Sequence, residues 1–111
     1  MSTNEYMVQL DSNGYAPSIV QKPEDTDHRC YLCHQTNIIP NRHEIFHGPY
    51  RSKSKEYGLW VTLCLECHMA LHERWPTIDK RLKREGQMAA AFKYGWTPED
   101  MRARFGKNYF E

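Results

Sequence analysis

The C-terminal half of the chain carries apolar residues at helical spacing. From Leu63 onward, the positions 63, 67, 70 and 71 recur every three or four residues and predict a helix that Pro76 stops or interrupts. A second helix is predicted over 77–95, with Thr77 as candidate N-cap and Gly95 at its end. Its apolar residues are expected on or near one side: Ile78, Leu82, Met88, Ala89 and Phe92.

A third helix is predicted from its end signals. Thr97 is the candidate cap, Pro98 takes the first helical position, acidic residues fill the first turn and arginines the last, and Gly106 follows. The aromatic side chains are expected to fill a small core instead of stacking on bases: Trp60, Trp75, Tyr94, Trp96 and Phe105.

Before residue 64 the pattern is one of short extended pieces and turns. Residues 37–48, NIIPNRHEIFHG, predict two extended pieces around a Pro-Asn turn, and residues 50–58 are expected to be a basic loop. The segment 59–63, LWVTL, suits a strand or the lead-in to the following helix. Further upstream only EYMVQLD, residues 5–11, is a plausible strand. Short strands followed by helices predict a small α+β domain.

The length of the chain limits the number of domains. With 111 residues it is long enough for one small domain and too short for two ordinary ones. We expect an N-terminal arm over 1–27, a core over 28–75 and a C-terminal helical extension over 76–111 that packs on the core. No signal peptide and no apolar run of membrane-spanning length is evident, so we expect a soluble, cytoplasmic protein with no membrane partner.

Charge is divided unevenly between the arm and the rest of the chain. The net charge is +1, but residues 1–27 carry one lysine against five acidic residues, whereas residues 28–111 carry fourteen basic residues against nine acidic ones. The basic part therefore favours a polyanionic partner such as nucleic acid.

Four cysteines form two C-x-x-C pairs, Cys30/Cys33 and Cys64/Cys67. Two residues between ligands allow a tight turn to point both sulfurs at one ion, and two such turns complete a closed tetrahedral site. Without an export signal, this spacing favours a structural zinc ion (Zn²⁺) over disulfides or free thiols. One such turn on a hairpin and another at a helix start is the arrangement of treble-clef zinc fingers.

Three histidines lie close to these cysteines in the sequence. His34 follows Cys33 and is expected to be a surface or supporting group, because four sulfurs already fill the site. His68 and His72 are four residues apart on one helix, so both imidazoles can face one metal ion. The same spacing also arises by chance on a helix surface, and the spacing alone leaves both interpretations open.

Three segments of the chain together resemble a known family. CYLC (30–33), HEIFHGPYRSKSKEYGL (43–59) and LCLECHMALH (63–72) resemble the HNH, or ββα-metal, endonucleases, and in particular small HNH proteins encoded by phages and prophages. The segments LKREGQMAAAF and FGKNYF resemble the ending of that group. The resemblance covers roughly residues 29–110 and implies a zinc-stabilised ββα-metal, treble-clef core with C-terminal helices.

The resemblance also implies a second metal site and its surroundings. His43, His68 and His72 match the ligands of a catalytic divalent ion (Mg²⁺, Mn²⁺, Ni²⁺ or Zn²⁺), and Glu44 stands where the family has its general-base histidine. Glutamate is the weaker base at neutral pH, with an unperturbed pKa of about 4.3. His47 is an alternative base, because on an extended strand it shares a face with His43. The family's asparagine is absent from GLWVTL.

The function expected from these features is cleavage of DNA. Arg51 is a candidate clamp for a phosphate, and one group of basic residues either grips the DNA backbone or forms a solvated helix face: Lys80, Arg81, Lys83 and Arg84. The prediction is a phage-encoded, metal-dependent endonuclease acting on double-stranded DNA in the bacterial cytoplasm. The alternative is a zinc-finger module with weak or no catalysis that binds nucleic acid or a protein.

Overall fold

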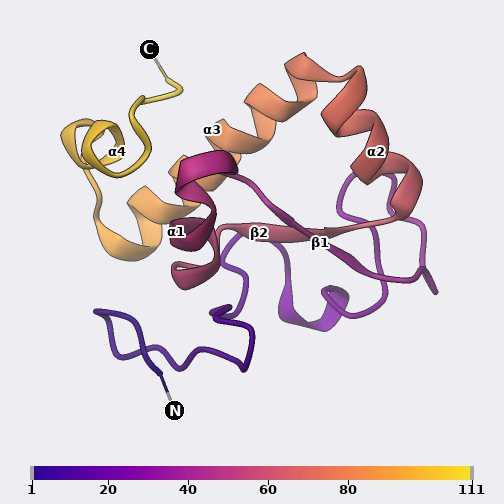
Figure 1. The fold of residues 1–111 in the computed structure, drawn as a ribbon, viewed down its shortest axis with the longest axis horizontal. Helices are drawn as coiled ribbons and strands as arrows, with labels where there is room; N and C mark the ends of the chain where they lie inside the picture. Colours follow the sequence, from indigo (N-terminus) through magenta and orange to yellow (C-terminus); the bar gives the residue numbers. More distant parts are fainter. Residues whose placement is uncertain (1, 111) are drawn as a thin grey trace.

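Residues 2–110 form a two-stranded sheet and four α-helices. The computed structural model describes residues 2–110, and the radius of gyration of its Cα atoms, 13.5 Å, is that of a compact domain of this size. The helices α2 and α3 lie on one side of the hairpin and the N-terminal segment on the other (Figure 1). In chain order the elements are η1 (Pro23–Asp25), β1 (Asn41–Glu44), η2 (Gly48–Tyr50), α1 (Arg51–Glu56), β2 (Trp60–Leu63), α2 (Leu65–Glu73), α3 (Pro76–Tyr94) and α4 (Pro98–Phe105).

The two strands form an antiparallel hairpin. Asn41 lies opposite Leu63 and Glu44 opposite Trp60, and every residue of β2 is buried. The LWVTL segment therefore contains a strand, as one of its two interpretations predicted, and α2 begins directly after it. A hairpin followed by a helix makes the molecule a small α+β domain. Within residues 2–110, no helix is long and apolar enough to cross a membrane.

The connection between the strands is helical, and the prediction of a loop over 50–58 was wrong. Ser54, on α1, is fully buried, and its hydroxyl accepts a hydrogen bond from the Phe46 amide and donates one to the Phe46 carbonyl, at 2.9 and 2.7 Å. These two bonds tie α1 to the end of the hairpin. A six-residue basic helix has little stability of its own, so tertiary contacts of this kind determine whether the segment is helical.

The ends of α3 and α4 follow the sequence signals with one exception. Gly95 and Gly106 both end a helix in the left-handed conformation, and Thr97 caps α4 by accepting from the Asp100 amide, as predicted. The N-cap of α3 is Trp75, not Thr77, because Pro76 already occupies the first helical position. A proline there costs no hydrogen bond, since the first amides of a helix are unpaired.

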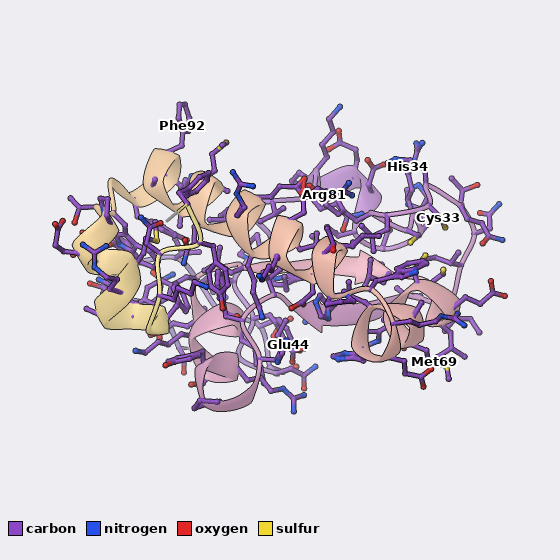
Figure 2. The ribbon with its side chains drawn as sticks, turned by 90° about the horizontal axis from the view of Figure 1, so that it is seen from above. Cys33, His34, Glu44, Met69, Arg81 and Phe92 are labelled. Atoms are coloured by element: carbon purple, nitrogen blue, oxygen red, sulfur yellow. The ribbon has the colours of Figure 1, made fainter. Side chains whose placement is uncertain are left out.

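The buried face of α3 agrees with the predicted one at Leu82 and Ile78 but not at Met88 and Phe92. Met88 and Phe92 are 60% and 96% exposed, and Phe92 projects away from the molecule in Figure 2. Leu82 and Ala90, eight residues apart on one face, are buried together with Gln87. Gln87 is tolerated there because its amide nitrogen donates to the Lys107 carbonyl and its oxygen accepts from the Tyr109 amide, both at 2.8 Å.

The aromatic residues do fill the core, as expected. Trp60, Trp96 and Phe105 are buried, and Trp75 and Tyr94 are partly buried against the same cluster. The core joins the hairpin to α3 and α4 through apolar contact, for example the stacked rings of Phe46 and Phe105, whose centroids are 4.1 Å apart.

The N-terminal segment packs along the hairpin without forming the predicted strand over 5–11. Met7 has φ +65°, and the Asn4 side chain accepts hydrogen bonds from the amides of Tyr6 and Val8, so the chain turns at this point. A short polar side chain that captures nearby amides competes with strand pairing. Further along, the Trp60 indole donates to the Ala16 carbonyl at 2.7 Å, which fixes the segment against β2.

A close approach of this segment to the turn before β2 makes Gly58 sensitive to substitution. Gly58 has φ +74°, and a Cβ on it would lie 2.2 Å from the Pro17 carbonyl oxygen. We expect Gly58→Ala to lower the free energy of unfolding by about 2–3 kcal/mol, since both the backbone and the Pro17 segment must shift. Denaturant unfolding measures this change.

The matched control is Gly95→Ala. Gly95 has the same φ, +74°, but nothing lies within 4 Å of its Cβ position. Its substitution is therefore expected to cost only about 1 kcal/mol of backbone strain. Equal losses in the two variants would contradict the close contact with Pro17.

Candidate metal centres

The four cysteine sulfurs come together where the hairpin meets α2. The Sγ atoms of Cys30, Cys33, Cys64 and Cys67 all lie within 4.8 Å of one another, and none is in a disulfide. Cys33 Sγ and Cys64 Sγ are 3.9 Å apart. This is close to the separation of about 3.8 Å between two sulfurs of a tetrahedron with Zn–S bonds of about 2.3 Å. The cluster could therefore hold one metal ion such as zinc.

The two cysteine pairs form equivalent turns. The Cys33 amide points at Cys30 Sγ, at 3.5 Å, and the Cys67 amide points at Cys64 Sγ, at 3.4 Å. Burial acts to raise the pKa of Cys30, but the amides that donate to its sulfur, first that of Cys33, outweigh burial and lower the pKa to about 7. The thiolate is the form that binds a metal, so the first turn favours the ligating state at Cys30, whereas burial raises the pKa of Cys67.

His34 lies outside the sulfur group. It adopts φ +65°, and its amide donates to the Cys30 carbonyl at 2.9 Å, which completes the first turn. Its side chain is exposed next to Cys33 at one end of the molecule (Figure 2). The ring therefore faces solvent beside the cluster.

Three histidines, one of them distant from the other two in the sequence, form a second group. One ring nitrogen each of His43, on β1, and of His68 and His72, on α2, lie within 4.8 Å of one another. The ring centroids are 5.3 Å apart for His43 and His68, 5.4 Å for His43 and His72, and 4.9 Å for His68 and His72. His43 is buried, His68 half-buried and His72 exposed, so the group opens to solvent on one side.

His43 supplies a test of whether this group fits a cation. Its Nε2 is buried and has no hydrogen-bond partner among the described residues. Burial, with His68 and His72 nearby, lowers the pKa of His43 to about 3. The imidazole is thus neutral at neutral pH, and a buried polar atom without a partner is costly in a structural role. Three imidazoles are a donor set suited to a divalent transition metal.

Glu44, the next residue on β1, makes contacts of its own. Neighbouring residues of a strand point to opposite faces, and the Glu44 Oε1 accepts hydrogen bonds from Arg51 Nε at 2.8 Å and from the Tyr15 hydroxyl at 2.7 Å. Burial acts to raise the pKa of Glu44, but these two hydrogen bonds outweigh it and hold the pKa below its ordinary value. Glu44 is therefore a carboxylate near α1, where Figure 2 labels it.

The side chain of Arg51 forms an ion pair with Glu44 and is also exposed to solvent. Its side chain is 65% exposed although Nε is held by Glu44. The guanidinium thus presents its remaining donors to solvent in a fixed direction. A planar donor group of this kind matches a phosphate.

His47 lies beside the histidine group together with a residue that the sequence did not indicate. Its ring centroid is 5.9 Å from that of His72 and 6.3 Å from that of His43. Its Nε2 is 3.7 Å from Oδ1 of Asp79, in the first turn of α3. His47, His72 and Asp79 line a cavity of about 260 Å³ next to the group. Asp79 is 32 residues from His47, and no local pattern connects the two.

No protein-family model, no curated protein and no solved structure matches the chain. The function is therefore inferred from the residues and their geometry.

Two of the four basic residues of the KRLKR segment are engaged within the molecule. Lys83 pairs with Asp79 at 2.9 Å, and Arg84 lies over the Phe110 ring at 5.3 Å. Lys80 and Arg81 are exposed, and Figure 2 shows Arg81 on the outer side of α3. Only part of this segment is therefore presented for a phosphate backbone.

Proposed function

We propose that the chain is a metal-dependent endonuclease of the HNH type that hydrolyses phosphodiester bonds of double-stranded DNA. The order of elements, a turn with two cysteines, a hairpin with His43 and a helix with Cys64, Cys67 and two histidines, is the order expected of a ββα-metal, treble-clef core. The observation that carries the proposal is the convergence of three imidazole nitrogens, one of them from His43, whose buried Nε2 has no hydrogen-bond partner within residues 2–110.

Hydrolysis of a phosphodiester needs an activated water, neutralisation of negative charge and a stabilised leaving oxygen. A divalent ion held by His43, His68 and His72 would supply the charge neutralisation and assist the leaving 3′ oxygen. Arg51 is placed to donate to a neighbouring phosphate, with Glu44 fixing its direction. Either Glu44 or His47 accepts the proton of the attacking water.

In this proposal the cysteine cluster has a different task from the histidine group. Four thiolates leave no open position for substrate, so zinc there is structural. It links the turn at Cys30 to the start of α2, where Cys67 directly precedes His68. The structural ion thereby helps to orient two ligands of the proposed catalytic one.

One observation favours a second candidate, a zinc-finger module without nuclease activity that binds nucleic acid or a protein. The carboxylate at the position of the family's base is engaged by Arg51 and Tyr15. A protein that had lost catalysis would retain the cysteine cluster and the fold.

Plasmid nicking distinguishes the two candidates. We expect the zinc-loaded protein to nick supercoiled DNA in Mg²⁺, Mn²⁺ or Ni²⁺, because the histidine group accepts an exchangeable ion. His68→Ala should lower the rate by more than the roughly 100-fold that loss of a supporting group at a metal site costs. Agarose gel electrophoresis of the plasmid forms measures both rates.

The matched control is His28→Ala, because His28 pairs with Asp27 and lies outside the histidine group. It should nick as fast as the unaltered protein. Inactivity in all three metals with intact DNA binding would support the non-catalytic module instead.

A further inference from the structure

We propose that His47 accepts the proton of the attacking water and that Asp79 is the positioning residue that orients its imidazole. This inference rests on the proposed nuclease function and decides between its two candidate bases. It also gives a role to Asp79, which lies on α3 and therefore outside the hairpin and α2, the elements that carry the histidine group.

The first support is the position of His47 relative to the histidine group. Its ring is 5.9 Å from that of His72 and 6.3 Å from that of His43, whereas the rings of the three grouped histidines are 4.9 to 5.4 Å apart. His47 is therefore adjacent to the proposed ligands but outside the set whose nitrogens converge. This is the place for a group that acts on a water instead of binding the ion.

The second support is the carboxylate behind the ring. Asp79 Oδ1 is 3.7 Å from His47 Nε2, and Asp79 Oδ2 accepts from Lys83 Nζ at 2.9 Å. The side chains of Asp79 and Lys83 are only 20% and 14% exposed, so the carboxylate is held in place. A carboxylate facing Nε2 favours the tautomer with the proton on that nitrogen and leaves Nδ1 as the acceptor.

The distance of 3.7 Å is longer than a hydrogen bond. Hydrogen bonds of catalytic groups often shorten only when substrate is bound. A movement of about 0.5 Å would bring Asp79 Oδ1 within the limit of about 3.2 Å for an N–H···O hydrogen bond to His47.

The third support is the cavity beside His47. The cavity that His47, His72 and Asp79 line has a volume of about 260 Å³ and is open to solvent. It is smaller than the roughly 300–1,000 Å³ of pockets for drug-sized ligands and larger than the roughly 30 Å³ that one water takes up, so it has room for a water beside His47 and the proposed ligand His72.

The competing base faces a different environment. Glu44 is close enough to His68 for its charge to act on that ring, but its Oε1 already accepts hydrogen bonds from Arg51 and Tyr15. The role of Glu44 in this assignment is to orient Arg51 toward the substrate.

The proton transfer runs through His47. The attacking water gives its proton to His47 Nδ1 as the water oxygen bonds to phosphorus, and the leaving 3′ oxygen takes a proton from solvent.

The test uses the full-length, zinc-loaded chain and a nicking assay that separates kcat from KM. His47→Ala should lower kcat by about 100-fold or more with little change in KM, which is the contribution of a general base. Added imidazole should restore part of the lost rate in His47→Ala, because free imidazole can take the place of the missing proton acceptor. Glu44→Gln should lower kcat far less than His47→Ala.

Asp79 is tested by a conservative series. Asp79→Asn should lower kcat by between about 10-fold and 100-fold, the cost of a misplaced catalytic group, and Asp79→Glu should recover part of it. Asp27→Asn is the matched control, because Asp27 also pairs with a histidine, His28, at 2.6 Å, but that histidine is not part of the histidine group. It should leave kcat unchanged.

A second readout does not depend on activity. Binding of Co²⁺ to the histidine group, followed by its visible absorption in zinc-loaded protein, should be unchanged in His47→Ala and in Asp79→Asn and weakened in His72→Ala. Weakened Co²⁺ binding in His47→Ala would make His47 a ligand and overturn the assignment. An active protein whose kcat is insensitive to His47→Ala would overturn it too, while an inactive unaltered protein would overturn the proposed function and this inference with it.

Discussion

Cys67→Ser is expected to unfold much of the domain. Cys67 is 6% exposed, lies in the first turn of α2, and has its sulfur within 4.8 Å of the other three. Binding of structural zinc contributes an apparent 10–16 kcal/mol in small zinc domains. That is as large as the whole stability of about 5–15 kcal/mol of an ordinary domain. Loss of one thiolate therefore removes the main link between Cys30 and α2.

Circular dichroism, thermal unfolding and zinc content measure this effect. We expect Cys67→Ser and Cys30→Ser to bind less than one zinc per chain and to lose the cooperative transition, and a chelator should do the same to the unaltered protein. His34→Asn is the matched control, since it lies next to Cys33, outside the sulfur group, and asparagine tolerates the φ of +65°. An unchanged melting temperature in Cys67→Ser would contradict a structural metal site.

His72→Ala is expected to have the opposite profile, an intact fold and lost cleavage. His72 is exposed on α2, so its removal leaves no cavity and costs little stability. Its nitrogen is one of three that converge, and two imidazoles hold an ion less tightly than three. Loss of a residue that only supports a metal ligand lowers activity by up to about 100-fold. His72 is proposed as a ligand itself, so we expect the nicking rate to fall by more than that. His43→Ala should abolish nicking as well.

Activity and folding must be measured on the same preparations. The expected result for His72→Ala is one zinc per chain, an unchanged circular dichroism spectrum and a melting temperature close to that of the unaltered protein. His28→Ala again serves as the control, with both activity and stability retained. If His72→Ala unfolded as badly as Cys67→Ser, the division into a structural and a catalytic site would be wrong.

Much of the local structure could be predicted, because its signals lie within a few residues. The ends of α4 follow from Thr97, Pro98 and Gly106, which act through the backbone of one helical turn. The spacing within each cysteine pair dictates the local turn, and the four-residue step from His68 to His72 places both rings on one face of α2.

In three places the local pattern was misleading, because particular side-chain hydrogen bonds decided the structure. The strand expected over 5–11 is replaced by a turn that Asn4 holds. The loop expected over 50–58 contains a helix because Ser54 bonds to Phe46. The face of α3 was misjudged because the Gln87 amide finds its partners in the C-terminal segment, more than twenty residues away at Tyr109.

The residue spacing alone indicates two cysteine turns and a helix with two histidines on one face. The folded chain adds three facts: His43 meets those histidines, Tyr15 and Arg51 hold Glu44, and Asp79 lies next to His47. This difference arises because a turn or a helical face depends on bonds between neighbouring residues. The neighbours of a side chain across the core depend on how every element packs.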